Sequence, residues 1–410
     1  MKFAFVRHTQ MKPLTLVETF VGCGGAHLGF IQNGFKSLLV NDIDRDMLNT
    51  LLLNNVTQEE KMFHGSISDL RGGVLKKYIS EPVDVLFGGI VCKGFSTVGL
   101  RNPFDERNYL FREQLRLVEV LRPKVSIIEN VPALKSMYLY RQDDKIVKDV
   151  QAYLQLLEKN KKLYGEKRRR RKKGIEYEDI RSTMASNRVK MKTILNRLEE
   201  YKFNVFEEIK QRYNQLGYTV TSKIMNASDY GSFTRRKRLI IVAVRQDIQK
   251  QFRFPEKSAQ LAQKKTLQDA LDHIDYNGIN NPKIDNDNQA MKHRRDSIRR
   301  FHLIPEGKTL ADVMDNIPKE LRLSSQYSRG SACRLDRNKP VPTLVPGTCN
   351  FPIHPWKDRL LTVREAATIT GFPITYKFSG SCVSKCIQVG NAVPVHIASA
   401  IAKSIIALLS

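Results

Sequence analysis

Two apolar segments of this chain end in residues that carry chemistry, and this arrangement constrains the fold more than any other feature. Residues 84–90 form a strand-like run with two glycines, and Cys92 follows directly. Residues 125–128 form a second such run, which ends in Glu129 and Asn130. Buried parallel strands are nearly continuous apolar runs, and reactive groups in α/β sheets gather beyond the carboxyl ends of the strands. We therefore expect an α/β fold in which this thiol and this carboxyl share one crevice.

A single cysteine is more often a small buried hydrophobe than a nucleophile. The position of Cys92 just past a strand, together with an acid at the end of the next strand, favours the nucleophile.

The start of the chain has the pattern of a nucleotide-binding unit. An apolar strand at 14–17 leads into a glycine turn at 22–25 and then a helix, and a second strand at 37–40 ends in Asp42. Glycines in such a turn let a ligand approach the backbone, and an acid after the second strand binds ribose hydroxyls. A glycine turn alone is weak support, and Asp42 is also a good helix cap. The spacing of the two features nevertheless favours a nucleoside site.

A basic stretch lies beside a further apolar strand. Arg235 to Arg238 form this stretch, and residues 239–244 are the strand. A run of arginines is usually a solvated face. Because this run adjoins a buried strand, we expect it at the edge of a site.

These motifs together resemble the cytosine-C5 DNA methyltransferase family, in its prokaryotic restriction-modification or phage-defence form. Gly-Gly-x-x-Cys at 88–92 and Glu-Asn-Val at 129–131 look like its catalytic pair, and segments 359–373 and 388–395 are similar to its last two blocks. The resemblance implies an α/β, Rossmann-like S-adenosylmethionine-dependent methyltransferase sheet with helices on both faces. A small target-recognition domain and a helical insertion would complete the fold.

The family resemblance also implies a reaction and a site. The enzyme would transfer a methyl group from S-adenosylmethionine to C5 of a flipped cytosine in double-stranded DNA, through a covalent bond between Cys92 and C6. The catalytic residues would be Cys92, Glu129, Asn130, Arg236 and Arg238. The cofactor would be held by Phe20, Gly22, Gly24, Gly25, Asp42, Ile43, Ile67, Gly88, Leu110, Asn391 and Val393. No metal is expected.

The sequence departs from the family pattern at a few positions. Ile90 and Val91 stand where the family has one or two prolines before the cysteine, and Ser66 stands where an aspartate usually contacts adenine. Glu18 replaces an aspartate and Thr234 a glutamine. The departures put the rigidity of the cysteine loop and the affinity for the cofactor in question.

Composition bears on the partner and the compartment. The chain has 68 Lys and Arg against 42 Asp and Glu, a formal charge of +26, which suits a polyanion such as DNA. Its six cysteines have neither zinc-site spacing nor the pattern of a disulfide framework. No long apolar span and no signal-peptide core are present, so we expect a bacterial cytoplasmic protein associated with the nucleoid.

We expect three domains along the chain. Residues 1–250 would form the catalytic and cofactor-binding domain, 251–335 the target-recognition region, and 336–410 a return to the catalytic domain. An insertion at about 140–205 is expected to be two helices joined by a basic loop at 167–173. That run is either a solvated loop, a localisation signal or a grip on phosphate.

Three other functions remain open at this level. A tRNA cytosine-C5 methyltransferase would share the fold, but that branch is compact. A DNA-binding subunit without activity would be consistent with Ser66 and the altered cysteine loop. An oxidoreductase would leave Cys92 and Glu129 unexplained. The target sequence and any partner nuclease or defence protein are not encoded in a recognisable motif.

Overall fold

The computed structural model describes residues 12–90, 102–258, 264–322, 332–347 and 351–410. These residues fall into two compact units. The first contains the described parts of 1–90, 113–132 and 216–410, and the second contains those of 91–112 and 133–215. The domain limits expected at 250 and 335 remain a prediction.

A seven-stranded sheet forms the centre of the first unit, in the order β3-β2-β1-β4-β5-β9-β8. Strands β1 to β5 pair in parallel, whereas β9 runs antiparallel to both of its neighbours. The strands are β1 (Thr15–Thr19), β2 (Lys36–Asp42), β3 (Met62–His64), β4 (Val85–Gly89), β5 (Val125–Asn130), β8 (Tyr218–Asn226) and β9 (Lys237–Arg245). The predicted α/β class and the five strand positions discussed above are confirmed.

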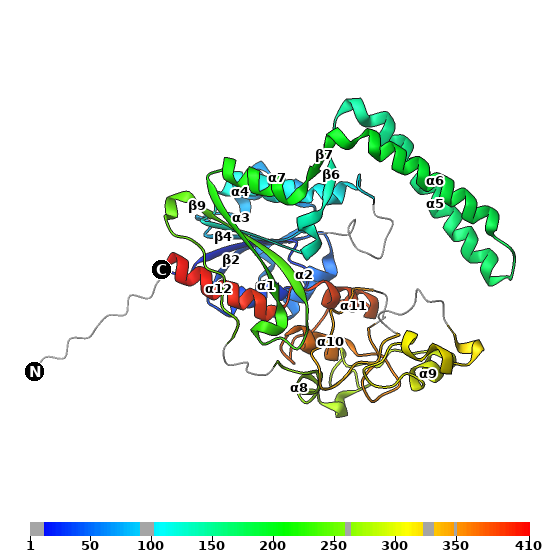
Figure 1. Ribbon diagram of the computed structural model, residues 1–410. Coiled ribbons are helices and arrows are strands. Elements are labelled where there is room, and N and C mark those ends of the chain that lie inside the picture. The colour runs from blue at the N-terminus through cyan, green and yellow to red at the C-terminus, as the bar shows by residue number, and fades with distance from the viewer. Residues whose placement is uncertain (1–11, 91–101, 259–263, 323–331, 348–350) are drawn as a thin grey trace, which may run out of the picture. The chain divides into compact units, whose positions relative to one another are not determined.

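Helices cover both faces of this sheet (Figure 1). Helices α1 (Gly25–Ile31) and α12 (Val395–Leu409) lie together on one face, where Phe30 and Ile401 pack in one apolar cluster with Phe87 and Ile127 of the strands. Helix α3 (Gly72–Tyr78) and the part of α4 (Leu110–Leu121) from residue 113 onward lie on the other face. Helix α2 (Arg45–Leu53) follows β2. Helix α12 contacts α1, the helix that follows the glycine turn.

The later part of the first unit contains short helices and little sheet. They are α8 (Leu267–Leu271), α9 (Arg295–His302), α10 (Val363–Thr370) and α11 (Cys382–Asn391). Helix α8 begins at a capping box formed by Thr266 and Asp269. A separate apolar cluster includes Phe301, Leu321, Ile353 and Leu360, and the buried Arg334 donates to the backbone carbonyls of Phe301, Ile304 and His354.

The second unit contains the expected helical insertion. Helices α5 (Val147–Lys172) and α6 (Glu178–Arg197) run side by side (Figure 1). Strands β6 (Tyr138–Tyr140) and β7 (Lys202–Asn204) pair at the base of the insertion, and α7 (Val205–Gln215) follows.

The prediction of a basic loop at 167–173 is wrong for all but the last residue, because helix α5 continues to Lys172. Lys and Arg are good helix formers, and Glu166 pairs with Arg169 and Arg170 one turn later. Basic side chains also suit the C-terminal end of a helix. The run therefore extends the helix instead of ending it.

Within the described residues, no single helix is long and apolar enough to cross a membrane, and only the bent pair α11 and α12 reaches that length and composition together. No group of three or more His, Cys, Asp or Glu side chains in the same part of the chain is arranged to hold a metal ion.

Candidate active site

The carboxyl ends of the parallel strands bring the predicted site residues to one edge of the sheet. Gly88 of β4 is paired with Thr19 of β1, and Gly89 is paired with Glu129 of β5. The two strands that the sequence placed before Cys92 and Glu129 are therefore direct neighbours. Cys92 itself lies outside the described residues, which end here at Ile90.

Glu129 is buried in this edge and faces an arginine from β9. Because β9 runs antiparallel to β5, the start of β9 lies beside the end of β5. Arg238 Nε lies 2.7 Å from Glu129 Oε1. Burial raises the pKa of the Glu129 carboxyl, and the positive charges of Arg238 and Arg236 oppose this rise. The structure thus brings together three of the five predicted catalytic residues.

Arg236 is almost fully buried, with 3 % of its surface exposed. Its Nη1 donates to the carbonyl of Leu344 at 3.1 Å, while its Nε has no hydrogen-bond partner among the described residues. Burial lowers the pKa of this guanidinium, and the nearby Arg238 adds to the effect. A buried donor without an acceptor is costly, so this N–H is suited to an acceptor on a bound substrate.

Asn130 joins the ends of β4 and β5. Its Nδ2 donates to the carbonyl of Ile90 at 3.3 Å, and its Oδ1 accepts from the backbone N–H of Val131 at 2.7 Å. The side chain is buried. Asn130 therefore holds the backbone at Ile90, two residues before Cys92.

The glycine turn after β1 is open and closely tied to Asp42. Phe20 has a φ of 53° and Gly22 a φ of 56°, and both lie in the left-handed region. A Cβ placed on Gly22 would meet no atom within 4 Å, so this backbone borders open space. Asp42 accepts hydrogen bonds from the N–H groups of Gly22 (2.9 Å) and Asp44 (3.0 Å). Burial raises the pKa of Asp42.

The next residue, Ile43, exposes 73 % of its surface beside this turn. An open glycine turn, a carboxylate with remaining lone pairs and an exposed apolar side chain fit a nucleoside-bearing cofactor.

The segment before α12 closes against the same turn. A Cβ on Gly25 would lie 2.3 Å from the carbonyl oxygen of Val393, so only glycine fits there. A Cβ on Gly89 would lie 3.5 Å from the Phe20 carbonyl and 3.9 Å from both Glu129 Oε2 and Val393 Cγ2. The glycine turn, the segment before α12 and the ends of β4 and β5 therefore meet at one place.

The remaining predicted cofactor residues occupy different environments. Ile67 is buried, and Asn391 is the exposed last residue of α11. Leu110 is the half-buried first residue of α4 and belongs to the second unit. Ser66 caps the short turn that follows it by accepting from the N–H of Ser68.

The sequence reasoning missed three supporting side chains, which are Gln114, His27 and Tyr376. Gln114 of α4 accepts from the hydroxyl of Thr19 at 2.6 Å and fills the space that a Cβ on Gly88 would occupy. Glu18 and His27 form a fully buried pair at 3.0 Å beneath the turn, and burial raises the pKa of Glu18. A polar residue inside an apolar strand or helix is a signal for such pairs, but it does not identify the partner.

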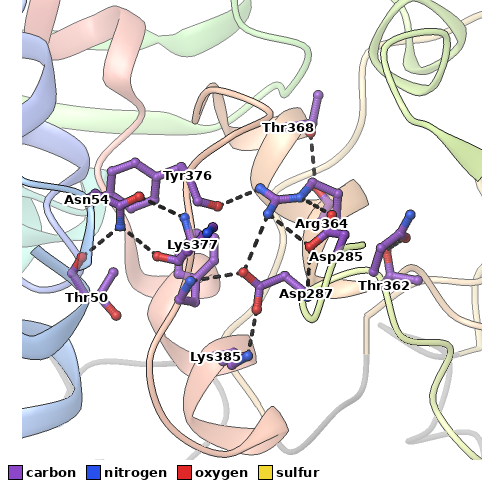
Figure 2. A network of polar contacts seen from close by, with 12 residues as sticks. Thr50, Asn54, Asp285, Asp287, Thr362, Arg364, Thr368, Tyr376, Lys377 and Lys385 are labelled. Atoms are coloured by element: carbon purple, nitrogen blue, oxygen red, sulfur yellow. Dashed lines mark hydrogen bonds and ion pairs between the residues drawn. The ribbon is translucent and has the colours of Figure 1, made fainter. Parts of the chain in front are cut away.

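Tyr376 is the third of these side chains, and it connects the turn to a wider polar network. Its hydroxyl donates to the Cys23 carbonyl at 2.8 Å, and its own carbonyl accepts from Arg364 Nη1 at 2.6 Å. Figure 2 shows Arg364 reaching both Asp285 and Asp287, and Lys385 reaching Asp287 at 2.6 Å. These bonds join Asp285 and Asp287 of the expected recognition region to helices α10 and α11.

Comparison with known proteins supplies the context for this geometry. The sequence model of the family described as C-5 cytosine-specific DNA methylase matches residues 14–155 and 192–407 of the chain. The match covers the sheet, the turn and the strand ends described above. It leaves out residues 156–191.

Individual relatives extend over nearly the whole chain. The chain is 30 % identical to the type II methyltransferase M.PspPI of Psychrobacter sp. (strain TA137) over 404 residues, 97 % of this chain and 80 % of the relative. It is 29 % identical to M.Eco47II of Escherichia coli over 406 residues, 96 % of this chain and 79 % of the relative. Among solved structures, one described as a DNA modification methyltransferase encoded within an E. coli prophage has a similar fold. Its TM-score is 0.62 at 22 % identity, and the match covers 97 % of this chain and 99 % of that one.

Proposed function

Because the chain belongs to the C-5 cytosine-specific DNA methylase family, it is a DNA (cytosine-5-)-methyltransferase, and we propose that Cys92 is its nucleophile. Glu129, Arg236 and Arg238 would act on the target cytosine, and S-adenosylmethionine would be the methyl donor. The observation that carries this proposal is the buried Glu129, which is paired with Arg238 beside the strand that leads to Cys92.

The reaction requires activation of a weakly nucleophilic carbon. The Cys92 thiolate would bond to C6 of the cytosine, which moves electron density toward C5 and N3. A protonated Glu129 would donate to N3 and stabilise the charge that develops there. Bound S-adenosylmethionine supplies the electrophilic methyl group that C5 takes up. Loss of the C5 proton to a base then allows the bond between sulfur and C6 to break and restores the free thiol.

The surroundings of Glu129 suit this role. Burial raises the pKa of its carboxyl, which favours the protonated form needed to donate to N3. Arg238 orients the carboxyl, and the unpaired Nε of the buried Arg236 offers a donor to the O2 edge or a phosphate of the flipped nucleotide. Asn130 would position the Cys92 loop through Ile90.

The cofactor would lie along the glycine turn. Asp42 would bind the ribose hydroxyls, Ile43 would cover the adenine, and the backbone of Gly22 would face the amino-acid part. The other residues proposed for this site are Phe20, Gly24, Gly25, Ile67, Gly88, Leu110, Asn391 and Val393. Ser66 offers only a hydroxyl, already used as a cap, where the family has a carboxylate.

The substrate would be duplex DNA, from which the target base must be flipped to reach Cys92. A formal charge of +26 favours binding to phosphate. Residues 251–335 would recognise the target sequence. By analogy with its type II relatives, the enzyme would protect the DNA of a bacterial cell against a partner nuclease or within a phage-defence system.

Covalent trapping tests the proposal. DNA with 5-fluorocytosine at the methylated position should form a stable adduct with the wild type, because fluorine cannot leave as a proton does. The methylated position is found first by bisulfite sequencing of DNA from cells that express the chain. Cys92→Ser should abolish both turnover and trapping while cofactor and DNA binding remain, because one atom changes.

Two results would contradict the proposal. Trapping by the Cys92→Ser variant would show that another residue is the nucleophile. A wild type that binds DNA but neither shifts its melting temperature with S-adenosylmethionine nor methylates DNA would instead support a DNA-binding subunit without activity.

A further inference from the structure

We propose that the helix pair of the second unit is a rigid arm that binds the phosphate backbone of duplex DNA without reading bases. The arm is defined as residues 147–197, which comprise α5, α6 and the turn between them. This inference rests on the proposed function only in taking DNA as the substrate. It adds a second contact surface to the site at the edge of the sheet.

The arm concentrates positive charge in an added segment. Residues 147–197 contain sixteen Lys and Arg against six Asp and Glu, a net formal charge of +10 out of +26 for the chain. The family sequence model passes over residues 156–191, which are most of the arm. The methyltransferase domain that the family shares is therefore matched without this charge.

The acidic side chains of the arm are largely neutralised within it. Five of the six form ion pairs with arm cations: Asp149 with Arg197, Glu158 with Lys161, Glu166 with Arg169 and Arg170, Glu178 with Arg181, and Asp179 with Arg170. Little negative charge is therefore left to repel a polyanion.

Many basic side chains of the arm remain available to a ligand. Nine that are exposed have no acidic side chain within ion-pair distance in the described part of the chain: Lys148, Lys159, Lys162, Arg168, Arg171, Lys173, Arg188, Lys190 and Lys192. Such a density of like charge destabilises a compact structure and exceeds what solubility requires. A polyanionic ligand would neutralise these exposed positive charges.

A buried seam makes the arm rigid. Tyr153, Ile194 and Leu198 are buried between the helices, with Val150, Leu157 and Met191 packed beside them. Leu154, the next residue after Tyr153, is 36 % exposed and lies outside this seam.

One polar pair lies within the seam and sets the pairing of the helices. Asn187 Nδ2 donates to Asn160 Oδ1 at 2.9 Å, and both side chains are buried. A buried polar pair of this kind fixes the register of two helices. Because the two helices are already held together, their basic side chains sit on an ordered backbone. Binding therefore costs little additional conformational entropy of the backbone.

The length of the arm matches a duplex. At ~1.5 Å per residue, the 26 residues of α5 span ~39 Å. At ~3.4 Å per base pair, this is the length of about 11 base pairs of DNA. Contacts of this kind position a protein but do not specify a sequence.

The test compares two charge-matched variants of the full chain. The arm variant carries Lys159→Gln, Lys162→Gln, Arg168→Gln and Arg171→Gln, because glutamine keeps the helix propensity. The control variant carries Lys76→Gln, Lys77→Gln, Lys250→Gln and Lys403→Gln, which are exposed basic residues of the first unit. Circular dichroism checks that both variants keep the wild-type helix content.

Affinity for a random-sequence duplex is then measured over a salt series. We expect the slope of log affinity against log salt to fall by about 0.9 for each arm side chain that contacts phosphate, and by less in the control. Bisulfite sequencing should find the same methylated positions for all three proteins.

Equal slopes in the arm and control variants would overturn the proposal and favour an acidic protein as the partner of the arm. A changed methylated sequence would overturn the claim that the arm reads no bases. Failure of the wild type to trap 5-fluorocytosine DNA would contradict the proposed chemistry, and the binding comparison would still decide the role of the arm.

Discussion

At the scale of single residues, the surroundings of Glu129 bear most directly on the chemistry. Glu129 is 7 % exposed and has an arginine beside its carboxyl, so two opposing effects act on its proton. Burial, the larger effect, raises its pKa, and the two arginines lower it. The carboxyl therefore keeps its proton to a higher pH than an exposed glutamate, while Cys92 must lose its own proton to react.

A glutamine at position 129 tests this assignment. Glu129→Gln keeps a hydrogen-bond donor but cannot transfer a proton to N3, so single-turnover methylation should slow by ~10²–10⁴-fold. In the wild type, the rate should fall at high pH as Glu129 loses its proton. The variant should lack this alkaline decline, which a pH series of single-turnover rates measures.

The exposed Glu60 provides the matched control, since Glu60→Gln should change neither rate nor pH profile. A Glu129→Gln variant with the wild-type alkaline decline would assign that titration to another group.

At the level of secondary structure, the start of α1 approaches the segment before α12 closely, and this contact shapes the glycine turn. Gly25 packs against the backbone of Val393, and Gly29 packs against Ala398 further along the same pair of helices. Side chains at these positions would force the helices apart. The turn between β1 and α1 therefore depends on a contact that spans almost the whole chain.

Gly25→Ala should separate these elements, because its Cβ would lie 2.3 Å from the Val393 carbonyl oxygen. We expect a loss of about 1–3 kcal/mol in the free energy of unfolding from overpacking, together with weaker binding of S-adenosylmethionine. Chemical denaturation and calorimetric titration measure the two effects.

Gly73→Ala is the matched control, because a Cβ there meets no atom within 4 Å in helix α3. It should leave cofactor binding unchanged and be neutral or slightly stabilising. Wild-type cofactor affinity in Gly25→Ala would show that the turn does not depend on this contact.

At the scale of the whole molecule, charge and burial together set how stability depends on pH. His354 is fully buried, with Arg359 nearby and the buried Glu365 carboxylate 3.5 Å from its Nε2, and burial followed by Arg359 lowers its pKa to about 3. Its pKa in the unfolded chain is about 6.5. The folded state is thus relatively stable above pH 6.5 and loses stability as protonation of the unfolded chain begins below that pH.

His354 should therefore contribute to acid destabilisation. Between neutral pH and pH 5, protonation of His354 in the unfolded chain should lower the free energy of unfolding by about 2 kcal/mol. This value follows from about 1.36 kcal/mol per pH unit over the roughly 1.5 pH units between the unfolded pKa of about 6.5 and pH 5. His354→Gln should show a shallower fall of melting temperature over this range than the wild type. Calorimetry from pH 5 to 8 measures both slopes, and identical slopes would contradict the assignment.

Local patterns along the chain were sufficient to predict several parts of this protein. Apolar runs located the strands, and the glycine turn, Asp42, Cys92 and Glu129 followed from their positions at strand ends. Parallel neighbours align their carboxyl ends, so these residues could be expected at one edge without coordinates. Helical spacing also predicted the insertion, although local pattern did not show that α5 would continue through the basic run.

Contacts between side chains that are far apart in the sequence could not be predicted in this way. Arg238 reaches Glu129 because β9 runs antiparallel to β5, and strand direction is not written in an apolar run. The contact of Gln114 with Gly88 likewise depends on packing between segments that are 26 residues apart. The hydrogen bond from Tyr376 to the Cys23 carbonyl joins residues that are 353 positions apart. Local propensity carries no information about such partners, because they are selected by register, close packing and the need to satisfy buried polar groups in the folded chain.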